Sequence, residues 1–458
     1  MRRGRVGAGV LGLLVACSGP DKAGPQDTAP SAYLSGTTFD LQFDGDPPRS
    51  VLLIVVDTLR RDHVSVYPDA VLPTTPWLAS QADHVYRVDG YHHPAAWTAP
   101  NTGSLLSALE PLHHGLILGE EGVGAVDAPL LPETFQAAGY ATAQLSANRW
   151  VGADTGMGAG FDWTWLEHDA AGTDLYAAAL DWMDAQPVEQ PLFLHLQPME
   201  PHTAYNPPAA FRGIYEDAPD DFPMTWEEQQ RLMDSYTSLS AEEQASTLAT
   251  LTGLYAEEVL AMDDQIRVLV EALDARGRLD DTLLVLTNDH GEAFNDGQDG
   301  EFLHGQSLRP EVTSGPLVFY NPRLIPGETT ALVSSLDLLP ALAGALGLDV
   351  PGGLDGLILD ATTSRDAAFA GRYGRSPTSG APILQASVGL DGDIRVHRTC
   401  DGETVAYDMV ADPHELSPLA VDEVSGGPAL LDALVAWQEA LLTEVGYPTD
   451  CDGAAPPP

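Results

Sequence analysis

The sequence predicts an α/β fold with a mixed, mostly parallel central sheet, helices on both faces and a smaller C-terminal α+β subdomain. Two observations predict it. Near-continuous apolar runs recur along the chain, and such runs fit strands that are covered on both faces. Segments with helical spacing of their apolar residues lie between these runs. Alternating strands and helices form wound sheets, whose ligands bind at the carboxyl ends of the strands.

Four apolar runs are expected to be strands. The first leads directly into Asp57 and the third into Asp289, so each places a carboxylate at a strand end. A helix is expected from Leu254 to Arg276, because its apolar residues recur at helical spacing. A last helix is expected near residues 428–445. The four expected strands are residues 49–57, 191–196, 282–287 and 316–320.

Composition divides the chain into four parts. Residues 1–17 are expected to be a lipoprotein signal peptide, and residues 18–48, rich in Gly, Pro, Ser, Asp and Thr, a flexible tether. Residues 49–345 form the expected main domain, which carries the candidate catalytic residues and an acid-rich insertion at residues 209–250. After it come a C-terminal subdomain and tail, residues 346–458, which open with a Gly/Pro-rich break.

The N-terminus has the pattern of an export signal. Arginines precede an apolar run from Val6 to Ala16, which is too short to span a bilayer but fits a signal-peptide core. The run ends in Leu14-Val15-Ala16-Cys17, which resembles the lipobox of bacterial lipoproteins and implies lipidation of Cys17. A plain signal peptide is the alternative. The prediction is a lipid-anchored protein of the cell envelope, on the periplasmic side of the outer membrane or at the cell surface.

The charge of the chain is strongly negative. Its 458 residues carry 67 acidic side chains against 21 Lys and Arg, a formal net charge of −46. Such a chain repels nucleic acid and anionic lipid surfaces at long range, so nucleic acid is excluded as a partner. A heavily hydrated surface explains the charge. A calcium-coated binding surface is the alternative, and no clustered loop motif supports it.

Besides Cys17, the chain has two cysteines, Cys400 and Cys451. An even pair in an exported protein predicts a disulfide, here one that ties down the C-terminal tail. Two free thiols are the alternative. Neither cysteine lies near the candidate catalytic motifs, so a cysteine nucleophile is not expected.

Several polar motifs follow one another in an order that carries more information than each motif alone. Asp57 ends the first strand, Thr98 lies in Trp97-Thr98-Ala99-Pro100, and His202 lies in a Pro-rich loop at residues 201–208. Thr287-Asn288-Asp289-His290-Gly291-Glu292 ends the third strand, and Leu303-His304-Gly305 follows it. Over about residues 50 to 420 this order resembles the sulfatase-like family of the alkaline phosphatase superfamily.

The resemblance implies a metal-dependent ester hydrolase. One divalent ion (Mn, Zn, Ca or Mg) would be held by Asp57, Asp289 and His290, with Thr98 as a further ligand and as the nucleophile. His202 and His304 would contact the ester and protonate the leaving group, and Asn148 would bind substrate beside them. The chemistry fits these residue types, since a divalent cation neutralises anionic ester oxygens and acidifies a bound hydroxyl. A histidine suits proton transfer near neutrality.

Departures from the family pattern indicate a threonine-nucleophile variant. Sulfatases proper use a Cys or Ser that is oxidised to formylglycine, and Thr98 cannot be so modified. Thr102 replaces the arginine of the modification motif, and Thr58 replaces a second metal-binding aspartate. Residues 146–150 contain no sulfate-binding lysine. These features favour phosphate or phosphonate esters over sulfate esters, because a phosphothreonine can be attacked by an activated water or alcohol.

The expected substrate is an anionic ester, either a small molecule or one linked to a glycan or lipid. A lipid anchor is expected to attach the protein to the membrane. Two other functions stay open. A transferase would pass a phospho-headgroup to an alcohol through the same Thr98 intermediate, although such enzymes commonly follow transmembrane helices. A catalytically silent binding lipoprotein would keep the fold, although Asp57, Thr98 and Asp289 are all present.

Overall fold

A computed structural model describes residues 32–33, 41–117, 124–126, 128–219, 221–359, 363–375 and 382–445. The expected signal peptide with its lipidation site Cys17, most of the expected tether, and Cys451 lie outside the described residues. Cys400 lies within them and is disulfide-bonded. Its predicted pairing with Cys451 stays a prediction.

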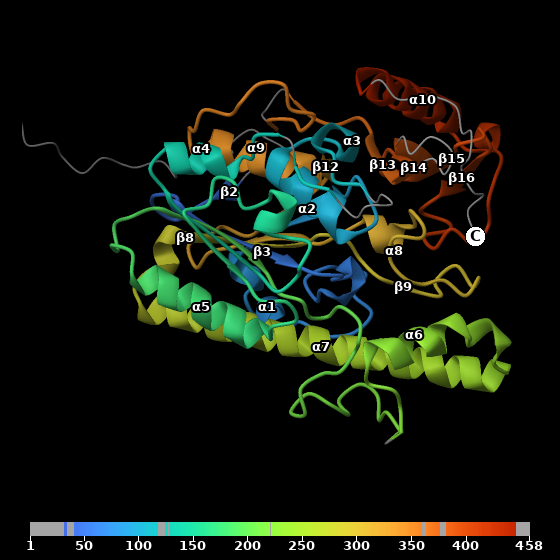
Figure 1. Cartoon of the computed structure of the whole chain (residues 1–458), viewed down its shortest axis with the longest axis horizontal. Coiled ribbons are helices and arrows are strands. Elements are labelled where there is room, and N and C mark those ends of the chain that lie inside the picture. Colours follow the sequence, from blue (N-terminus) through green and yellow to red (C-terminus); the bar gives the residue numbers. More distant parts are fainter. Residues whose placement is uncertain are drawn as a thin grey trace, which may run out of the picture.

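An eight-stranded sheet forms the centre of the molecule (Figure 1). Every neighbouring pair in it is parallel except the two pairs that β11 makes with β4 and β8, which are antiparallel. This confirms the mixed, mostly parallel sheet expected from the sequence. Its strands, in spatial order, are β12 (Gly327–Ser334), β4 (Val85–His92), β11 (Leu317–Tyr320), β8 (Thr282–Asn288), β3 (Ser50–Val56), β7 (Leu192–Gln197), β5 (Ala141–Ser146) and β6 (Trp163–Leu166).

The central strands are buried on both faces. Every residue of β3, β7 and β8 is buried, as their apolar runs predict. Successive side chains of a strand point to opposite faces, so β3 feeds two separate cores. Leu52, Ile54 and Val56 pack in one core, and the intervening residues of the strand pack in the other.

Each core is closed by its own layer of helices, visible above and below the sheet in Figure 1. The helices that contribute to the first core are α1 (Pro76–Ser80), α5 (Gly172–Asp184) and α7 (Ala241–Ala275). Those that contribute to the second are α2 (Thr98–Ser107), α4 (Pro132–Ala137) and α9 (Ser335–Ala345).

Helix α7 begins 13 residues earlier than its apolar periodicity predicts, at Ala241. Ser240 caps the helix, since its side-chain hydroxyl accepts a hydrogen bond from the backbone N–H of Glu243. In turn, the Glu243 carboxylate accepts a hydrogen bond from the backbone N–H of Ser240. This reciprocal cap starts the helix inside the acid-rich segment. The rest of the insertion contains α6 (Trp226–Asp234), whose Met233 is buried in the first core.

The folded domain begins before Arg49. Leu41 and Phe43, in the segment expected to be a tether, are fully buried in the second core, and Phe43 bridges to Leu324. Two short strands, β1 (Ala32–Tyr33) and β2 (Leu41–Gln42), pair there. Apolar residues spaced too sparsely to give a periodic signal therefore anchor this segment.

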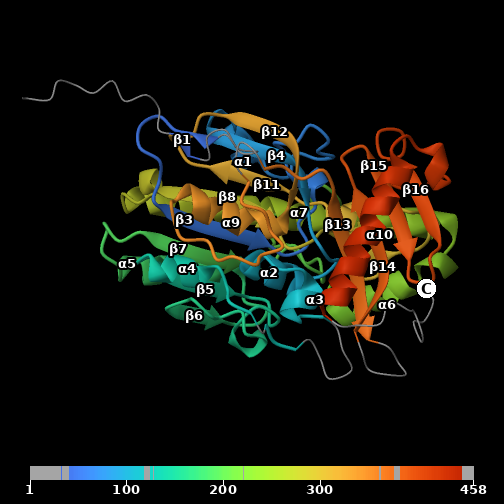
Figure 2. The ribbon, with the colours of Figure 1, turned by 90° about the horizontal axis from the view of Figure 1, so that it is seen from above.

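A separate antiparallel sheet follows the main domain, with α10 lying across it (Figure 2). Leu430 and Leu434 of α10 pack on Val396 and Ala406 of this sheet. The subdomain consists of β13 (Ala368–Arg375), β14 (Pro382–Leu390), β15 (Ile394–Thr399), β16 (Thr404–Asp408) and α10 (Gly427–Glu444). Within the described ranges, every helix is too short or too polar to cross a bilayer.

The remaining short elements lie between the sheets. They are α3 (Pro111–His114), α8 (Pro310–Thr313), β9 (Ala293–Phe294) and β10 (Phe302–Leu303). The loop that carries β9 and β10 joins the carboxyl end of β8 to β11, so it passes beside the candidate site described next.

Candidate functional site

Asp57, Asp289 and His290 meet at the carboxyl ends of β3 and β8. The two strands are parallel neighbours with Val56 opposite Asn288, so the residues that follow lie side by side. One ligand atom from each of the three residues lies within 4.8 Å of the others, and all three residues are buried. One oxygen of Asp57, Oδ1, is buried without a hydrogen-bond partner.

The electrostatics of these three residues fit a bound cation. Burial and the nearby Asp289 raise the pKa of Asp57 well above its usual range. Burial also raises the pKa of Asp289, to about 7. Burial and the His304 imidazole hold the pKa of His290 well below its usual range, so its ring is neutral. Two crowded carboxylates, a neutral imidazole and an unpaired oxygen form a donor set that a divalent ion would satisfy.

Thr98 lies beside this donor set. It is the first residue of α2 and is buried. Its Oγ1 is 3.2 Å from Nε2 of His290 and 3.4 Å from Nδ2 of Asn148. The first-turn amides of a helix have no partner within the helix and attract anions. The structure thus brings Thr98 together with the residues that the sequence places around it.

Two amide side chains orient the carboxylates. Nδ2 of Asn148, just after β5, donates to Oδ2 of Asp57 at 2.6 Å. Nε2 of Gln197, the last residue of β7, donates to Oδ2 of Asp289 at 3.1 Å. Gln197 lies outside the sequence motifs. Gln197 follows directly after an expected parallel strand, and Asp57 and Asp289 lie at the ends of two other strands of the sheet. This shared position is the sequence signal that could have identified it.

Glu292 holds His304 in place. It ends the motif at residues 287–292, and the sequence assigns it no role. Nδ1 of His304 is 2.9 Å from Oε1 of Glu292, and the hydroxyl of Tyr205 donates to the other oxygen of Glu292 at 3.0 Å. Burial lowers the pKa of His304, but the charge and hydrogen bond of Glu292 outweigh burial and leave the pKa above its usual value. Its ring lies 4.2 Å from that of His290.

His202 completes a row of three imidazoles. Its ring centroid lies 5.2 Å from that of His304, and its Nδ1 is 2.7 Å from the backbone oxygen of Thr203. Burial, together with the neighbouring His304, lowers the pKa of His202 to about 4. His202 is therefore neutral where His304 is charged, so the two histidines differ in what they can do. The charged one can donate a proton, whereas the neutral one donates its Nδ1–H to the Thr203 oxygen and keeps Nε2 as a hydrogen-bond acceptor.

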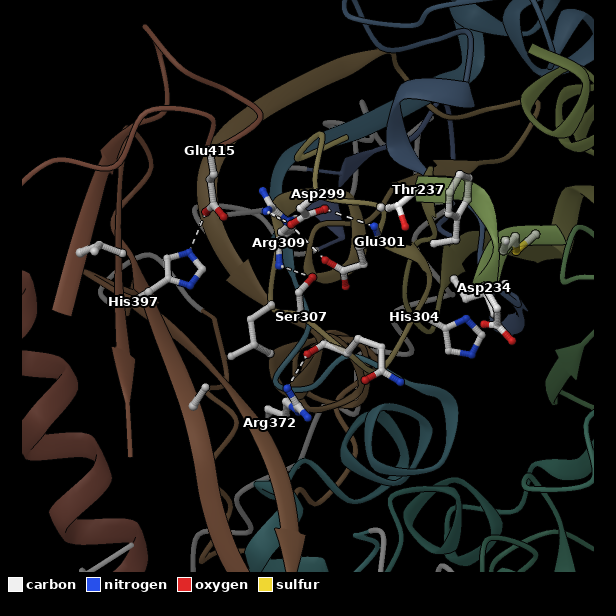
Figure 3. A pocket seen from close by; sticks show the side chains of 18 of the residues that line it. Asp234, Thr237, Asp299, Glu301, His304, Ser307, Arg309, Arg372, His397 and Glu415 are labelled. Carbon is white, nitrogen blue, oxygen red and sulfur yellow. Dashed lines mark hydrogen bonds and ion pairs between the residues drawn. The ribbon is translucent and has the colours of Figure 1, made fainter. Parts of the chain in front are cut away.

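A cavity of about 690 Å³ opens from His304 toward the C-terminal sheet (Figure 3). Its walls come from α6, from the loop that contains β10, and from the strands β13 to β16. Its size is within the range of small-molecule binding pockets. A substrate held in this cavity would reach the candidate site from the side of His304.

Comparisons with known proteins find relatives over most of the main domain. The family model described as Sulfatase matches residues 49–348. An ulvan-active sulfatase of Formosa agariphila is 26% identical over 198 residues, which are 40% of this chain and 37% of that protein. An arylsulfatase of Clostridium perfringens is 20% identical over 82% of this chain and 90% of its own length.

Solved structures share the fold. The phosphonate monoester hydrolase of Agrobacterium radiobacter superposes with a TM-score of 0.66 at 18% identity, over 87% of this chain and 96% of that one. At this identity the likeness shows the fold alone. The chain spans little more than a third of the length of the ulvan-active sulfatase.

Proposed function

The chain belongs to the sulfatase family, and on that premise we propose that it is a metal-dependent ester hydrolase that acts through a covalent Thr98 intermediate. Phosphate or phosphonate esters are its preferred substrates, ahead of sulfate esters. The observation that carries the proposal is the position of the Thr98 hydroxyl, 3.2 Å from a neutral His290 in a buried cluster with Asp57 and Asp289.

The residues of the site would divide the work as follows. A divalent ion held by Asp57, Asp289 and His290 would supply positive charge for the ester oxygens and lower the pKa of the Thr98 hydroxyl. Thr98 Oγ1, whose proton has passed to solvent, attacks phosphorus as an alkoxide, the bond to the ester oxygen breaks, and the electron pair leaves with that oxygen. Asn148 keeps Asp57 oriented through its 2.6 Å hydrogen bond.

His304 supplies the proton for the leaving oxygen. Glu292 holds its ring through Nδ1, which leaves Nε2 to face the substrate. In the second step water attacks the phosphothreonine, its proton goes to the now neutral His304, and Thr98 leaves as the alkoxide with which the cycle began. His202, which is neutral, contacts the substrate through Nε2, which can accept a hydrogen bond from a substrate hydroxyl.

The side chain of Thr98 supports phosphoryl over sulfuryl chemistry. A threonine has a methyl group on Cβ and cannot become the formylglycine of sulfatases, so it lacks the elimination route that releases sulfate from an aldehyde hydrate. Both ester classes occur among similar proteins, as the ulvan-active sulfatase and the phosphonate monoester hydrolase show by name. A phosphothreonine is hydrolysed by direct attack of water, which this site could support.

A substrate panel tests the proposal. The protein is assayed with 4-nitrophenyl sulfate, 4-nitrophenyl phosphate, bis(4-nitrophenyl) phosphate and 4-nitrophenyl phenylphosphonate, with Mn²⁺, Zn²⁺, Ca²⁺ or Mg²⁺ added in turn. We expect turnover that requires metal, is faster for a phosphoryl ester than for the sulfate, and falls about 10³-fold or more in Thr98→Ala. The absence of turnover with every metal, or a clear preference for the sulfate, would contradict the proposal.

We also propose that lipidation at Cys17 anchors the enzyme in the cell envelope, where it meets small-molecule or glycan- or lipid-linked anionic esters. The lipobox-like sequence before Cys17 supports this anchor. Labelling with a radioactive fatty acid in a bacterial host tests it, because Cys17→Ala should lose the label and appear in the soluble fraction.

A further inference from the structure

The cavity beside His304 contains an arginine that its surroundings do not neutralise. Arg372 projects from β13 of the C-terminal sheet, and Figure 3 shows it on the wall of the cavity that His304 also lines. Its side chain is partly buried. Within the described part of the chain its one hydrogen bond runs from Nη1 to the backbone oxygen of Gln306, at 2.8 Å, and it makes no ion pair.

The other basic groups of the cavity are occupied. Arg309 lies 2.7 Å from an oxygen of Asp299 and 3.4 Å from an oxygen of Glu301. His397 lies 2.7 Å from Oε1 of Glu415, and Nε of Arg395 lies 2.8 Å from the same oxygen. These pairs neutralise three of the carboxylates that line the cavity and leave Arg372 with guanidinium N–H groups to offer a ligand.

Arg372 differs from the other arginines that line this cavity and a second cavity of about 470 Å³. Carboxylates pair with Arg309 in the first and with Arg60, Arg61 and Arg395 in the second, whereas Arg372 has no such pair among the described residues. Holding a partly buried guanidinium without a carboxylate partner costs solvation free energy, which an anionic ligand would recover. The planar fork of the guanidinium suits carboxylate, sulfate and phosphate groups.

The cavity also offers groups that bind hydroxyls. Thr237, Ser307, Gln306 and Tyr407 line it together with the exposed carboxylate of Asp234 on α6. Hydroxyl, amide and carboxylate groups exchange hydrogen bonds with a polyhydroxylated ligand. The volume of about 690 Å³ holds a ligand larger than a simple aryl ester.

We propose that Arg372 binds a second anionic group of the substrate, so that the preferred substrate carries one anion as the reacting ester and another on the part that occupies the cavity. The inference rests on the proposed function for the first anion. Arg372 is then a specificity-determining residue supplied by the C-terminal sheet to a reaction carried out by the main domain.

Three hexose phosphates that share one phosphate and differ only at C6 test the inference. Glucose 1-phosphate has a hydroxyl there, glucuronic acid 1-phosphate a carboxylate, and glucose 1,6-bisphosphate a second phosphate. Calorimetric titration of the metal-loaded protein gives the affinity for each ligand. The affinity for glucuronic acid 1-phosphate or glucose 1,6-bisphosphate is then divided by the affinity for glucose 1-phosphate. Because the C1 phosphate is common to all three, the ratio isolates the group at C6.

We expect wild type to prefer the two C6 anions roughly 10- to 100-fold, the value of one hydrogen bond to a charged group. In Arg372→Gln the ratio should fall to near one, and Arg372→Lys should retain part of it because the charge remains. Arg231→Gln is the matched control, since it removes an exposed arginine of α6 that does not line the cavity. Its ratio should equal that of wild type.

Other outcomes overturn the inference. A wild-type ratio near one, a ratio that survives in Arg372→Gln, or no binding of any of the three ligands would each show that Arg372 does not select a second anion. The proposed function is read separately, from hydrolysis of the 4-nitrophenyl esters. Hydrolysis without anion selectivity refutes only the role of Arg372, whereas selective binding without hydrolysis refutes only the catalytic proposal.

Discussion

Replacing Asn148 by alanine removes the donor that orients a proposed metal ligand. Asn148 is buried, and its Nδ2 donates to Oδ2 of Asp57 at 2.6 Å. The other oxygen of Asp57 has no hydrogen-bond partner and faces the cluster with Asp289 and His290. The bond therefore fixes which oxygen of Asp57 is free to bind a cation.

The expected magnitude follows from this bond. A hydrogen bond to a charged group contributes about 1.5–3 kcal/mol. Loss of a partner that orients a metal ligand typically weakens metal binding about 10- to 100-fold, or about 1.4–2.8 kcal/mol. The two figures agree. The hydrogen bond also lowers the pKa of Asp57, so its loss makes a proton compete better with the metal.

The assay is a titration of metal-stripped protein with the activating ion. Metal affinity is measured by calorimetry or by competition with a chelator. Asn321→Ala is the matched control. Asn321 is equally buried, and its Nδ2 donates to backbone oxygens of Leu279, Asp280 and Thr282, away from the site. Both variants lose a buried amide, but only Asn148→Ala should lose metal affinity.

Equal metal affinity in Asn148→Ala and wild type, within about twofold, would refute the reasoning. Asp57 would then not be a ligand, or Asn148 would not be its partner. A rise in KM at saturating metal, with metal affinity unchanged, would instead indicate that Asn148 binds substrate directly.

Three further predictions concern the nucleophile, the metal and a buried acid. Thr98→Ser should keep substantial activity because the attacking oxygen survives. Thr98→Cys should gain no sulfatase activity because Thr102 replaces the arginine of the modification motif. The kcat/KM values of both variants on the aryl ester panel test this. Metal at 100 times its Kd should stabilise the fold by about 2.7 kcal/mol, seen as a higher Tm than in chelator. Burial raises the pKa of Glu258 to about 8, although the hydrogen bond from the Asn206 N–H lowers it. The protonated Glu258 side chain therefore contributes fully to stability below about pH 4.5, and this contribution is lost as the pH rises to 8. The Tm of Glu258→Gln minus that of wild type should thus grow from pH 5 to pH 8 and then level off; a constant difference would contradict this.

The sequence predicts the centre of the fold well because its strands are buried on both faces. The apolar runs of β3, β7, β8 and β11 are strands in the structure, and the carboxylates after β3 and β8 lie side by side. The reversed direction of β11 has no local signal, because an apolar run reads the same in either direction. It depends on the loop that returns from β8 past the site.

Strands at the sides of the sheet were not predicted. β4 mixes buried and half-buried residues, β6 alternates half-buried and exposed ones, and β5 contains the polar Thr142 and Gln144, so none forms an apolar run. The start of α7 depends on the Ser240 cap and not on periodicity. Contacts distant in sequence set these elements, and a single sequence does not display them.

The residues proposed to react were named from the sequence, whereas most of those that orient them were not. Asp57, Thr98, Asp289 and His290 carry motif signals because their chemistry demands particular residue types at strand and helix ends. Gln197 and Glu292 act through a neighbour, and what each does is defined only by the side chain it contacts. Arg372 was beyond reach for the same reason, because its cavity forms only where the C-terminal sheet meets α6 and the loop that contains β10.

The most direct test of the account is a search for the covalent intermediate on Thr98. The metal-loaded protein is mixed with the best phosphoryl ester of the panel, quenched in acid within the burst phase, digested, and analysed by tandem mass spectrometry. The account predicts a phosphoryl group on Thr98 that appears with substrate and metal and decays as substrate is consumed. An active enzyme whose Thr98 peptide stays unmodified, and whose Thr98→Ala variant keeps its turnover, would contradict it.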